Sequence, residues 1–403
     1  MDTAINAQQA VRLYINAKGQ DVDHGSYSAR ESYRYCPKQF ELTRVQGYSQ
    51  KEQRASAWFG KAIEAAIESF EGTGRRPHAA EEHFSETWKA VGGLKEAKDF
   101  TYTDSEGDWA GLLRAGVEMM TLYEIRAPYL PISTLPKARF QVPLRKTIFP
   151  NSPLQVLSNK AYIDVISYPE WNHPLLVRIP SHVSRVRPVI IDIKTAGVDL
   201  ETDIVGLDPQ LAEYAWQSRV RDVAFLWFVK RSHEIKKGSR ITLLRAAEIS
   251  GREFTVLGVE EKPGTLVYVA RTAECVKRFE DMLDGFSSPT TNIAKAAKRG
   301  FFESDEDVLA LPPALITKQR LQFGTARLSE QDVNEAGLAL AQTTIEMVQA
   351  TKTGVYPKTG GIRFPNQKCK FCAMRPICAG DSDARDRLLT RTGEEWLDGK
   401  DVD

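Results

Sequence analysis

The residues best suited to chemistry begin with an acid and a base on one predicted strand. Asp192 and Lys194 are separated by a single apolar residue and follow the apolar run 189–191. Alternate residues of a β-strand point to the same face, so this spacing places a carboxylate beside an ammonium group. A carboxylate can bind a divalent cation, and an ammonium can orient water or neutralise charge on a phosphate. The pair alone is a weak signal, because charged residues flank many strands.

Two further carboxylates precede that pair in the chain. Asp164 ends the predicted strand KAYID, and Glu64 lies at the edge of a predicted helix over about 55–70. With Asp192 they supply three hard oxygen ligands, which suit Mg²⁺ or Mn²⁺ in the cleavage of a phosphodiester. Glu68 follows Glu64 by one helical turn and is an alternative ligand. A lone glutamate on a helix is more often a solvated residue, so the hypothesis depends on the ordered set.

Cysteines form a second constellation. Cys369, Cys372 and Cys378 form a C-x2-C-x5-C pattern, and Cys36 lies more than three hundred residues earlier. The N-terminus lacks the features of an export signal and no apolar run suits a membrane helix, so we expect a cytoplasmic protein without stable disulfides. Clustered thiols then indicate a metal site, and their spacing alone fits four-cysteine zinc and iron–sulfur equally. Cys275, on a predicted amphipathic helix, is expected to be a buried apolar residue.

The elements that must position these residues mix helices and strands. Helices are predicted over 26–47, with an interruption at Pro37, over 55–70, within 75–130, from Asp208-Pro209 to about 220, over 272–286 and over 329–351. Strands are predicted at 138–144, 154–168, 186–196 and 222–230, and a hairpin at 254–270. This succession indicates a mixed α/β core. From Lys352 onward the sequence is loop-like.

In this order the motifs resemble those of PD-(D/E)XK nucleases of the RecB and AddB type. The matching residues are Glu64, Asp164, Asp192, Lys194, Gln210 and Tyr214. The resemblance implies an α/β fold with a restriction-endonuclease-like mixed sheet flanked by helices, helical insertions and a C-terminal iron–sulfur cluster segment. It implies that the three carboxylates bind Mg²⁺ or Mn²⁺, that Lys194 assists attack by water, and that Gln210 and Tyr214 line the site near the DNA backbone. One motif departs from the Gly-x-x-x-His of the closest relatives, because Gly60 is followed by Glu64.

The cysteines extend this resemblance to both ends of the chain. The segment SYRYCPKQFEL around Cys36 resembles the Cys-Pro-x-x-Phe segment of iron–sulfur nucleases of the AddB type and of CRISPR adaptation modules. In those proteins a distant cysteine joins a C-terminal C-x2-C-x5-C pattern. The resemblance implies a structural [4Fe–4S] cluster held by Cys36, Cys369, Cys372 and Cys378, which ties the two ends together.

The chain then divides into four expected parts. They are a helical region over 1–134 with the first cysteine and Glu64, a nuclease core over 135–235, a mixed β and helical region over 236–351, and a cluster segment with an acidic tail over 352–403.

The net charge of +1 means that binding of a polyanion would depend on local basic clusters. Three are candidates, although basic runs are more often solvated: Arg178, His182, Arg185 and Arg187; Arg231, Lys236, Lys237 and Arg240; Lys295, Lys298 and Arg299. We expect a DNA exonuclease that acts on single strands or ends. The alternatives are a DNA-end-binding subunit of a recombination, defence or spacer-acquisition complex, and a sequence-specific endonuclease. The chain encodes no helicase, because it has no Gly-x-x-x-x-Gly-Lys-Ser/Thr loop.

Overall fold

The computed structural model describes residues 12–51, 53–93, 100–102, 107–152, 154–169, 187–230, 240–243, 253–259, 267–270, 308–311, 316–318, 320–361 and 367–391. The predicted helix over 272–286, with Cys275, lies outside these residues. Most residues of the three predicted basic clusters also lie outside the described residues: Arg178, His182, Arg185, Arg231, Lys236, Lys237, Lys295, Lys298, Arg299 and the side chain of Arg240.

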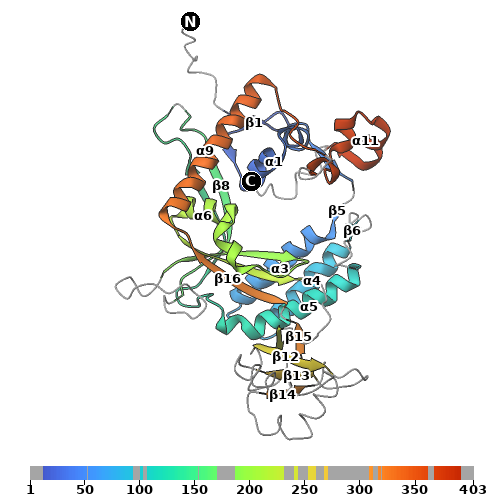
Figure 1. Cartoon of the computed structure of the whole chain (residues 1–403), viewed down its shortest axis with the longest axis vertical. Helices are drawn as coiled ribbons and strands as arrows, with labels where there is room; N and C mark the ends of the chain where they lie inside the picture. The colour runs from blue at the N-terminus through green and yellow to red at the C-terminus, as the bar shows by residue number, and fades with distance from the viewer. Residues whose placement is uncertain are drawn as a thin grey trace, which may run out of the picture.

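A six-stranded mixed sheet forms the centre of the molecule (Figure 1). Its strand order is β16-β10-β9-β8-β3, and β7 also pairs with β8. The strands are β3 (His24–Gly25), β7 (Arg139–Thr147), β8 (Ser158–Ser167), β9 (Val189–Ala196), β10 (Asp222–Val229) and β16 (Leu321–Arg327). β9 and β10 run parallel, whereas β8 pairs antiparallel with β9 and β16 pairs antiparallel with β10. The predicted mixed α/β fold is therefore confirmed.

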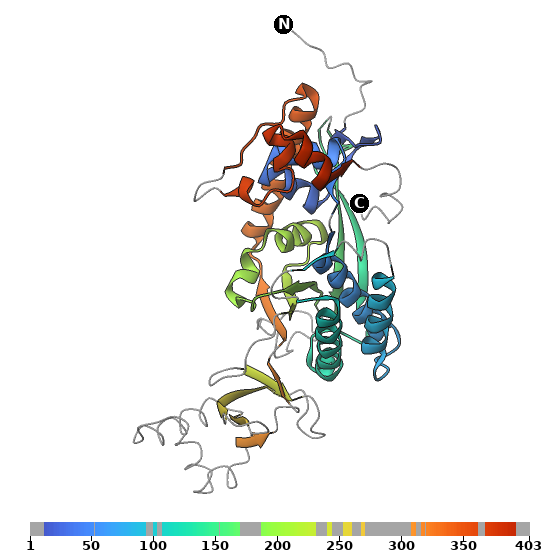
Figure 2. The ribbon, with the colours of Figure 1, turned by 90° about the vertical axis from the view of Figure 1, so that its right-hand side faces the viewer.

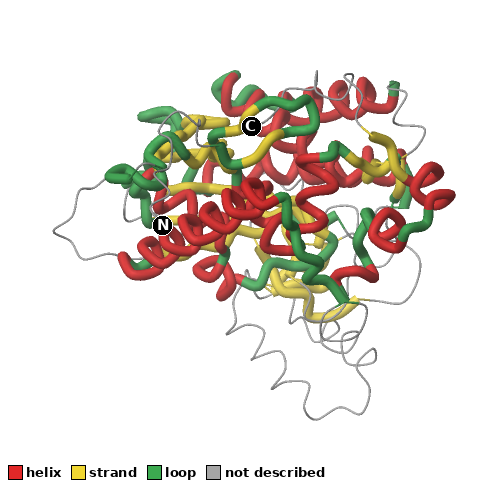
Figure 3. The backbone as a smooth tube through the Cα atoms, turned by 90° about the horizontal axis from the view of Figure 1, so that it is seen from above, coloured by secondary structure: helices red, strands yellow, loops and turns green. Residues whose placement is uncertain are grey.

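Helices cover both faces of this sheet, as the view from above shows (Figure 3). α3 (Ala55–Gly72), α4 (Ala79–Gly92) and α5 (Trp109–Arg126) pack on one face, and α6 (Pro209–Ser218) packs on the other. Successive residues of β9 alternate between the two cores: Ile191 belongs to the core under α3, and Ile190 to the core with α6. This alternation of side chains along the strand therefore determines which face of the sheet each polar residue of β9 points to.

The two terminal segments lie side by side at one end of the molecule (Figure 2). α1 (Tyr27–Tyr35), α2 (Pro37–Phe40) and a π-helical turn (Glu41–Val45) confirm the helix interrupted at Pro37. The predicted long helix is α9 (Glu330–Thr353), and the segment predicted as loop-like contains α10 (Arg375–Ala379) and α11 (Ser382–Leu388). β4 (Tyr48–Gln50) pairs antiparallel with β17 (Leu389–Arg391), which joins the two ends.

A second, five-stranded sheet is inserted between β10 and β16. Its order is β14-β13-β12-β11-β15, and all of its pairs are antiparallel. The strands are β11 (Arg240–Leu243), β12 (Glu253–Val259), β13 (Val267–Ala270), β14 (Val308–Leu311) and β15 (Ile316–Lys318). β12 and β13 confirm the predicted hairpin, whereas β11, β14, β15 and β16 were not predicted. Among the described helices, none is both long and apolar enough to cross a bilayer.

Candidate active site and cysteine site

Asp192 and Lys194 lie on β9, on the face of the sheet that α6 covers. Lys194 Nζ is 2.7 Å from Asp192 Oδ2, and it donates a 3.0 Å hydrogen bond to Gln210 Oε1. Gln210 Nε2 donates in turn to Tyr214 Oη at 2.6 Å. Gln210 and Tyr214 are four residues apart on α6, so both belong to one side of that helix. Four of the sequence-predicted residues therefore form one continuous chain of polar contacts.

Asp164 lies next to this chain, on the neighbouring strand β8. Its Oδ2 accepts a 2.8 Å hydrogen bond from the backbone amide of Ile193, the residue between Asp192 and Lys194. This bond fixes the carboxylate against β9 even though the two strands come from separate parts of the sequence.

Glu64 reaches the same place from α3. α3 approaches the end of β9 closely, because a Cβ on Gly60 would lie 3.5 Å from Thr195 Oγ1. Glu64 is half-buried and interacts electrostatically with Asp192, whereas Glu68 is exposed. Of the two glutamates considered from the sequence, the structure brings Glu64 to the other carboxylates.

The three carboxylates all have raised pKa values. Burial is the first cause for each, and it raises the pKa of Asp192 to about 7, of Glu64 to about 7 and of Asp164 to about 6. The positive charge of Lys194 opposes this rise at all three groups, while the neighbouring carboxylates add to it. Burial would lower the pKa of Lys194, but Asp192 and Asp164 outweigh it and raise that pKa. Lys194 is therefore a firmly protonated ammonium in a group of acids that resist ionisation.

A divalent cation fits this donor set. Asp192 Oδ2 is a buried oxygen that accepts no well-aligned hydrogen bond from a protein group, despite its close ion pair with Lys194. Carboxylate oxygens are the preferred ligands of Mg²⁺ and Mn²⁺, and a cation would offset the repulsion that raises the three pKa values. Glu64, Asp164 and Asp192 are thus the residues that could hold such an ion.

Another group of possible metal ligands lies on the helical side of the molecule. His78, Glu81 and Glu124 each place a ligand atom within 4.8 Å of the other two. The oxygens of Glu64, Asp164 and Asp192 do not all lie within that distance of one another. However, the carboxylate of Glu124 already accepts 2.8 Å hydrogen bonds from the amides of His78 and Ala80. These bonds satisfy free amides at the start of α4, so the group is better explained as a helix cap.

The four predicted cluster cysteines come together at the terminal segments. All four have free thiols that are partly buried: Cys36, Cys369, Cys372 and Cys378. Burial first raises the pKa of Cys372, and the other three cysteines are close enough to raise it further. Cys36 precedes Pro37 at the start of α2, and Cys378 lies on α10.

Hydrogen bonds hold the two cysteine-bearing segments against each other. Tyr35 Oη donates to the carbonyl of Lys368 at 3.0 Å, and Lys368 Nζ donates to the carbonyl of Tyr35 at 2.8 Å. Burial would raise the pKa of Cys36, but hydrogen bonds from Thr359 and the amide of Gln39 lower it below its usual range. A Cβ on Gly360 would lie 2.4 Å from Cys369 Sγ, so a larger residue at this position would displace that sulfur. The donor set of four thiols suits either iron–sulfur or zinc.

Two features of the site were not anticipated from the sequence. Lys61 lies three residues before Glu64 on α3, and its charge lowers the pKa of that glutamate. The i, i+3 spacing of Lys61 and Glu64 could have predicted this contact.

Among the predicted basic residues, the structure describes the side chain of Arg187. It forms a 3.1 Å ion pair with Asp222 rather than presenting a free charge.

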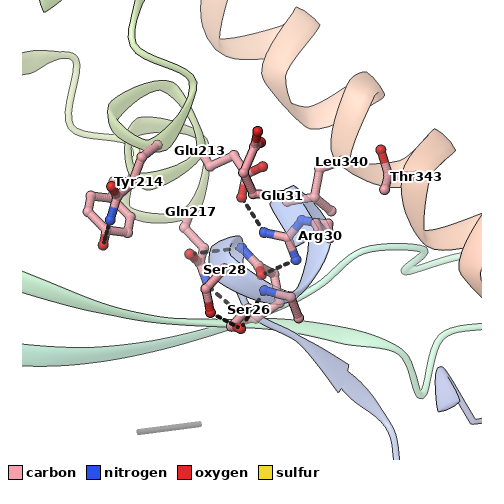
Figure 4. Close-up of polar contacts among 12 residues, drawn as sticks. Ser26, Ser28, Arg30, Glu31, Glu213, Tyr214, Gln217, Leu340 and Thr343 are labelled. Atoms are coloured by element: carbon pink, nitrogen blue, oxygen red, sulfur yellow. Dashed lines mark hydrogen bonds and ion pairs between the residues drawn. The ribbon is translucent and has the colours of Figure 1, made fainter. Parts of the chain in front are cut away.

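The second feature is a buried polar network that joins α1 to α6 (Figure 4). The fully buried Arg30 donates through Nη1 to Asn159 Oδ1 at 2.7 Å and through Nη2 to Glu213 Oε2. Asn159 Nδ2 donates to Gln217 Oε1 at 3.1 Å, and Arg34 also contacts Glu213. Glu213 adjoins Tyr214, so the network connects the helix before Cys36 to the helix of the acid site. No local pattern could pair residues this far apart in the sequence.

Comparison with known proteins gives one family match. The model for the PD-(D/E)XK nuclease superfamily matches residues 24–140, a span that contains Cys36 and Glu64 and ends before β8. No curated protein matches the chain. Among solved structures, the crystal structure of SSO0001 is matched at 12% identity over 50% of this chain and 70% of that one, with a TM-score of 0.18. Over residues 24–140 the chain is therefore similar to a superfamily of metal-dependent nucleases, and its mixed sheet flanked by helices is consistent with their fold.

Proposed function

We propose that the protein is a divalent-metal-dependent deoxyribonuclease, and specifically an exonuclease that hydrolyses phosphodiester bonds at DNA ends or in single strands. The observation that supports this most is the chain of contacts from Asp192 through Lys194 and Gln210 to Tyr214. It occurs beside two further carboxylates that are partly buried, Glu64 and Asp164, and the family match supports a metal-dependent nuclease with DNA as substrate.

The residues of this site divide the work between binding and orientation. Glu64, Asp164 and Asp192 would hold Mg²⁺ or Mn²⁺. When bound, the cation supplies Lewis-acid activation of water and offsets negative charge on the phosphate. Lys194 keeps its proton, because its pKa is raised, and its ammonium stabilises charge that develops on the phosphate oxygens.

Gln210 and Tyr214 act on Lys194 rather than on the metal. The amide oxygen of Gln210 accepts from Lys194 Nζ and so restricts where the ammonium can point. Tyr214 Oη accepts from the other end of the same amide, and burial raises the pKa of the phenol so that it stays neutral. Both side chains would also line the path of the DNA backbone. A fixed ammonium needs little reorganisation during the reaction, which is the main source of electrostatic catalysis.

We also propose that Cys36, Cys369, Cys372 and Cys378 hold a [4Fe–4S] cluster with a structural role. The proximity of four thiols from segments at opposite ends of the chain supports this. When bound, the cluster would cross-link α2 and α10 and so limit the separation of the two termini. Four-cysteine zinc is the competing occupant.

The decisive experiment is a cleavage time course with end-labelled linear DNA, single- and double-stranded, in Mg²⁺ or Mn²⁺. We expect Asp192→Asn to reduce cleavage by more than about 10³-fold, because losing a metal ligand exceeds the loss of one electrostatic donor. Glu68→Gln is the matched control and should cleave normally, since Glu68 is exposed. Equal cleavage by purified Asp192→Asn would remove the site assignment. A wild-type protein that binds DNA ends but never cuts them would favour an end-binding subunit of a larger complex.

A second experiment addresses the cysteines. Protein purified without oxygen should be brown and contain iron, and Cys372→Ser should lose that iron and expose the C-terminal segment to protease. Zinc in place of iron would replace the cluster assignment with a zinc site. A Cys372→Ser protein with undiminished iron would exclude that cysteine as a ligand.

A further inference from the structure

A cleft of about 420 Å³ opens beside the cysteine site, between residues from the two ends of the chain. Five of its lining residues carry positive charge and none carries negative charge: Lys51, Arg54, Lys370, Arg375 and Arg387. Phe371 also lines it. The whole protein is nearly neutral, so this concentration of one sign is local.

The five cations of this cleft are available to a ligand. All five side chains belong to exposed residues: Lys51, Arg54, Lys370, Arg375 and Arg387. Within the described part of the chain, none of them is paired with a carboxylate. Lys51 Nζ donates instead to the backbone carbonyl of Asp386. A polyanion would therefore find charges that do not first have to leave an acidic partner.

The cleft also presents an aromatic ring. Phe371 is 70% exposed although it lies between two of the cysteines in the sequence, and Leu388, which also lines the cleft, is 49% exposed. Lys370 Nζ lies 5.4 Å from the centroid of the Phe371 ring. Proteins that bind single-stranded nucleic acid combine exposed aromatic rings with cations, because unpaired bases stack on the rings while the cations contact phosphates.

A ridge of α3 leads from the cleft to the carboxylates. Arg54 lines the cleft as the residue immediately before α3, and Trp58 and Lys61 follow on α3 itself, three residues apart and so on one side of the helix. Lys61 Nζ lies 5.6 Å from the centroid of the Trp58 ring and is close enough to Glu64 to lower its pKa. With a rise of 1.5 Å per residue, Arg54 and Glu64 are about 15 Å apart along the helix.

We propose that this cleft, which we name the basic cleft, binds the backbone of single-stranded DNA and delivers the strand along α3 to the acid site. The inference rests on the proposed nuclease function and specifies the form of its substrate and the place where the substrate is held. Phe371 provides a platform for one base, and the arginines and lysines contact phosphates. A duplex keeps its bases stacked inside, so it cannot use the exposed ring.

Binding of a labelled oligothymidylate to the full-length protein without divalent metal tests this directly. The variant Arg54→Gln/Arg387→Gln avoids the residues between the cysteines. We expect its Kd to rise at least about tenfold at low salt, with the slope of log Kd against log salt reduced by about 1.4, or 0.7 per lost phosphate contact. The double variant Lys18→Gln/Lys89→Gln removes two exposed lysines outside the cleft and should bind like wild type.

Phe371 gives an independent measurement. Phe371→Ala should weaken binding about fivefold or more without changing the salt slope, whereas Phe371→Tyr should keep wild-type affinity because it still stacks. The iron content of both variants must equal that of the wild type, which separates stacking from damage to the cysteine site. Wild-type affinity and salt slope in Arg54→Gln/Arg387→Gln, or equal binding by Phe371→Ala and Phe371→Tyr, would overturn the proposal.

Cleavage separates this proposal from the proposed function. If the protein cuts DNA, the arginine variant should raise KM on long strands and leave kcat unchanged, while fragments too short to span about 15 Å should be cut equally by both proteins. If no protein cuts DNA but the binding losses occur, the basic cleft stands and the nuclease proposal fails. If cleavage occurs and its KM on long strands is unaffected by the variant, the nuclease proposal stands and the basic cleft fails.

Discussion

Asp164 and Asp192 lie on neighbouring strands of the six-stranded sheet, whereas the four cysteines lie in turns, between helices or in helices of three to five residues. Asp192 is 1% exposed and has a whole core on each side of its strand. The cysteines are all partly exposed, and a much smaller apolar cluster around Leu42, Met374 and Leu389 supports them. One site is set into the most deeply packed part of the fold, and the other is held between two chain ends.

The difference indicates which of the two sites is held more firmly by the protein itself. Strand pairing and burial position the carboxylates and raise their pKa values, so the acid site is preorganised and its carboxyl groups resist ionisation. The cysteine site depends on the short β4–β17 pair, a small apolar cluster and a few hydrogen bonds such as those between Tyr35 and Lys368. We therefore expect the acid site to respond to loss of its ligand electrostatically and the cysteine site to respond structurally.

The largest effect should come from Arg30, which connects the two regions. Arg30→Ala leaves the carboxylate of Glu213 buried with only Arg34 near it, so we expect destabilisation by about 3–5 kcal/mol in urea unfolding. The variant Arg30→Met/Glu213→Leu removes both charges and should recover much of that loss. A loss below about 1 kcal/mol for Arg30→Ala would show that the two regions are stabilised independently.

Lys194 should matter for reaction rate and little for the cysteine region. We expect Lys194→Gln to lower kcat by about 10²–10³-fold with a small change in KM, because its ammonium is needed mainly in the transition state. The metal content of the cysteine site and the protease resistance of the terminal segments should stay at wild-type levels. A change in either of these would mean that the acid site and the cysteine site are not separable.

The smallest effect concerns pH. The folded-state pKa values of about 7 for Asp192 and Glu64 lie above those of unfolded carboxyl groups, so the folded state binds more protons between about pH 4 and 7. Their contribution to stability is present at low pH and is lost as pH rises through about 7. In EDTA, the wild type should lose stability from pH 5 to 8 relative to Asp192→Asn. Magnesium should restore it at pH 8 and have little effect at pH 5. Parallel pH profiles for the two proteins in EDTA would contradict the assigned electrostatics.

Sequence patterns were sufficient where local chemistry decides the structure. Continuous apolar residues predicted β9 and β10, and Asp208-Pro209 predicted the start of α6, where the Asp208 side chain accepts from the amide of Leu211. The ordered motifs also selected a set of residues that the structure brings together around Asp192. The predictions of β9 and α6 depend on signals within about ten residues, whereas the site residues were selected by the order of motifs spread from Glu64 to Tyr214.

Long-range partners could not be read in this way. β16 (LQFGTAR) contains a glycine and only two of its residues are buried, so its strand character depends on pairing with β10. Arg30 and Glu213 carry no signal for each other, since a buried ion pair is visible only when the two helices are placed. The basic cleft joins the two ends of the chain, and separate basic residues in a sequence usually indicate no more than a solvated surface.

The inserted five-stranded sheet enters and leaves the core through adjacent strand ends. The amide of Val229 at the end of β10 donates to the carbonyl of Arg320 just before β16 at 2.8 Å. For the core, the roughly 90 intervening residues are therefore one long hairpin connection. Each doubling of loop length costs only about 0.6 kcal/mol of closure entropy, so this connection costs about 3 kcal/mol more than a tight turn. The core can thus accept large changes in the insert at a modest entropic penalty, without altering the strand that carries Asp192 and Lys194.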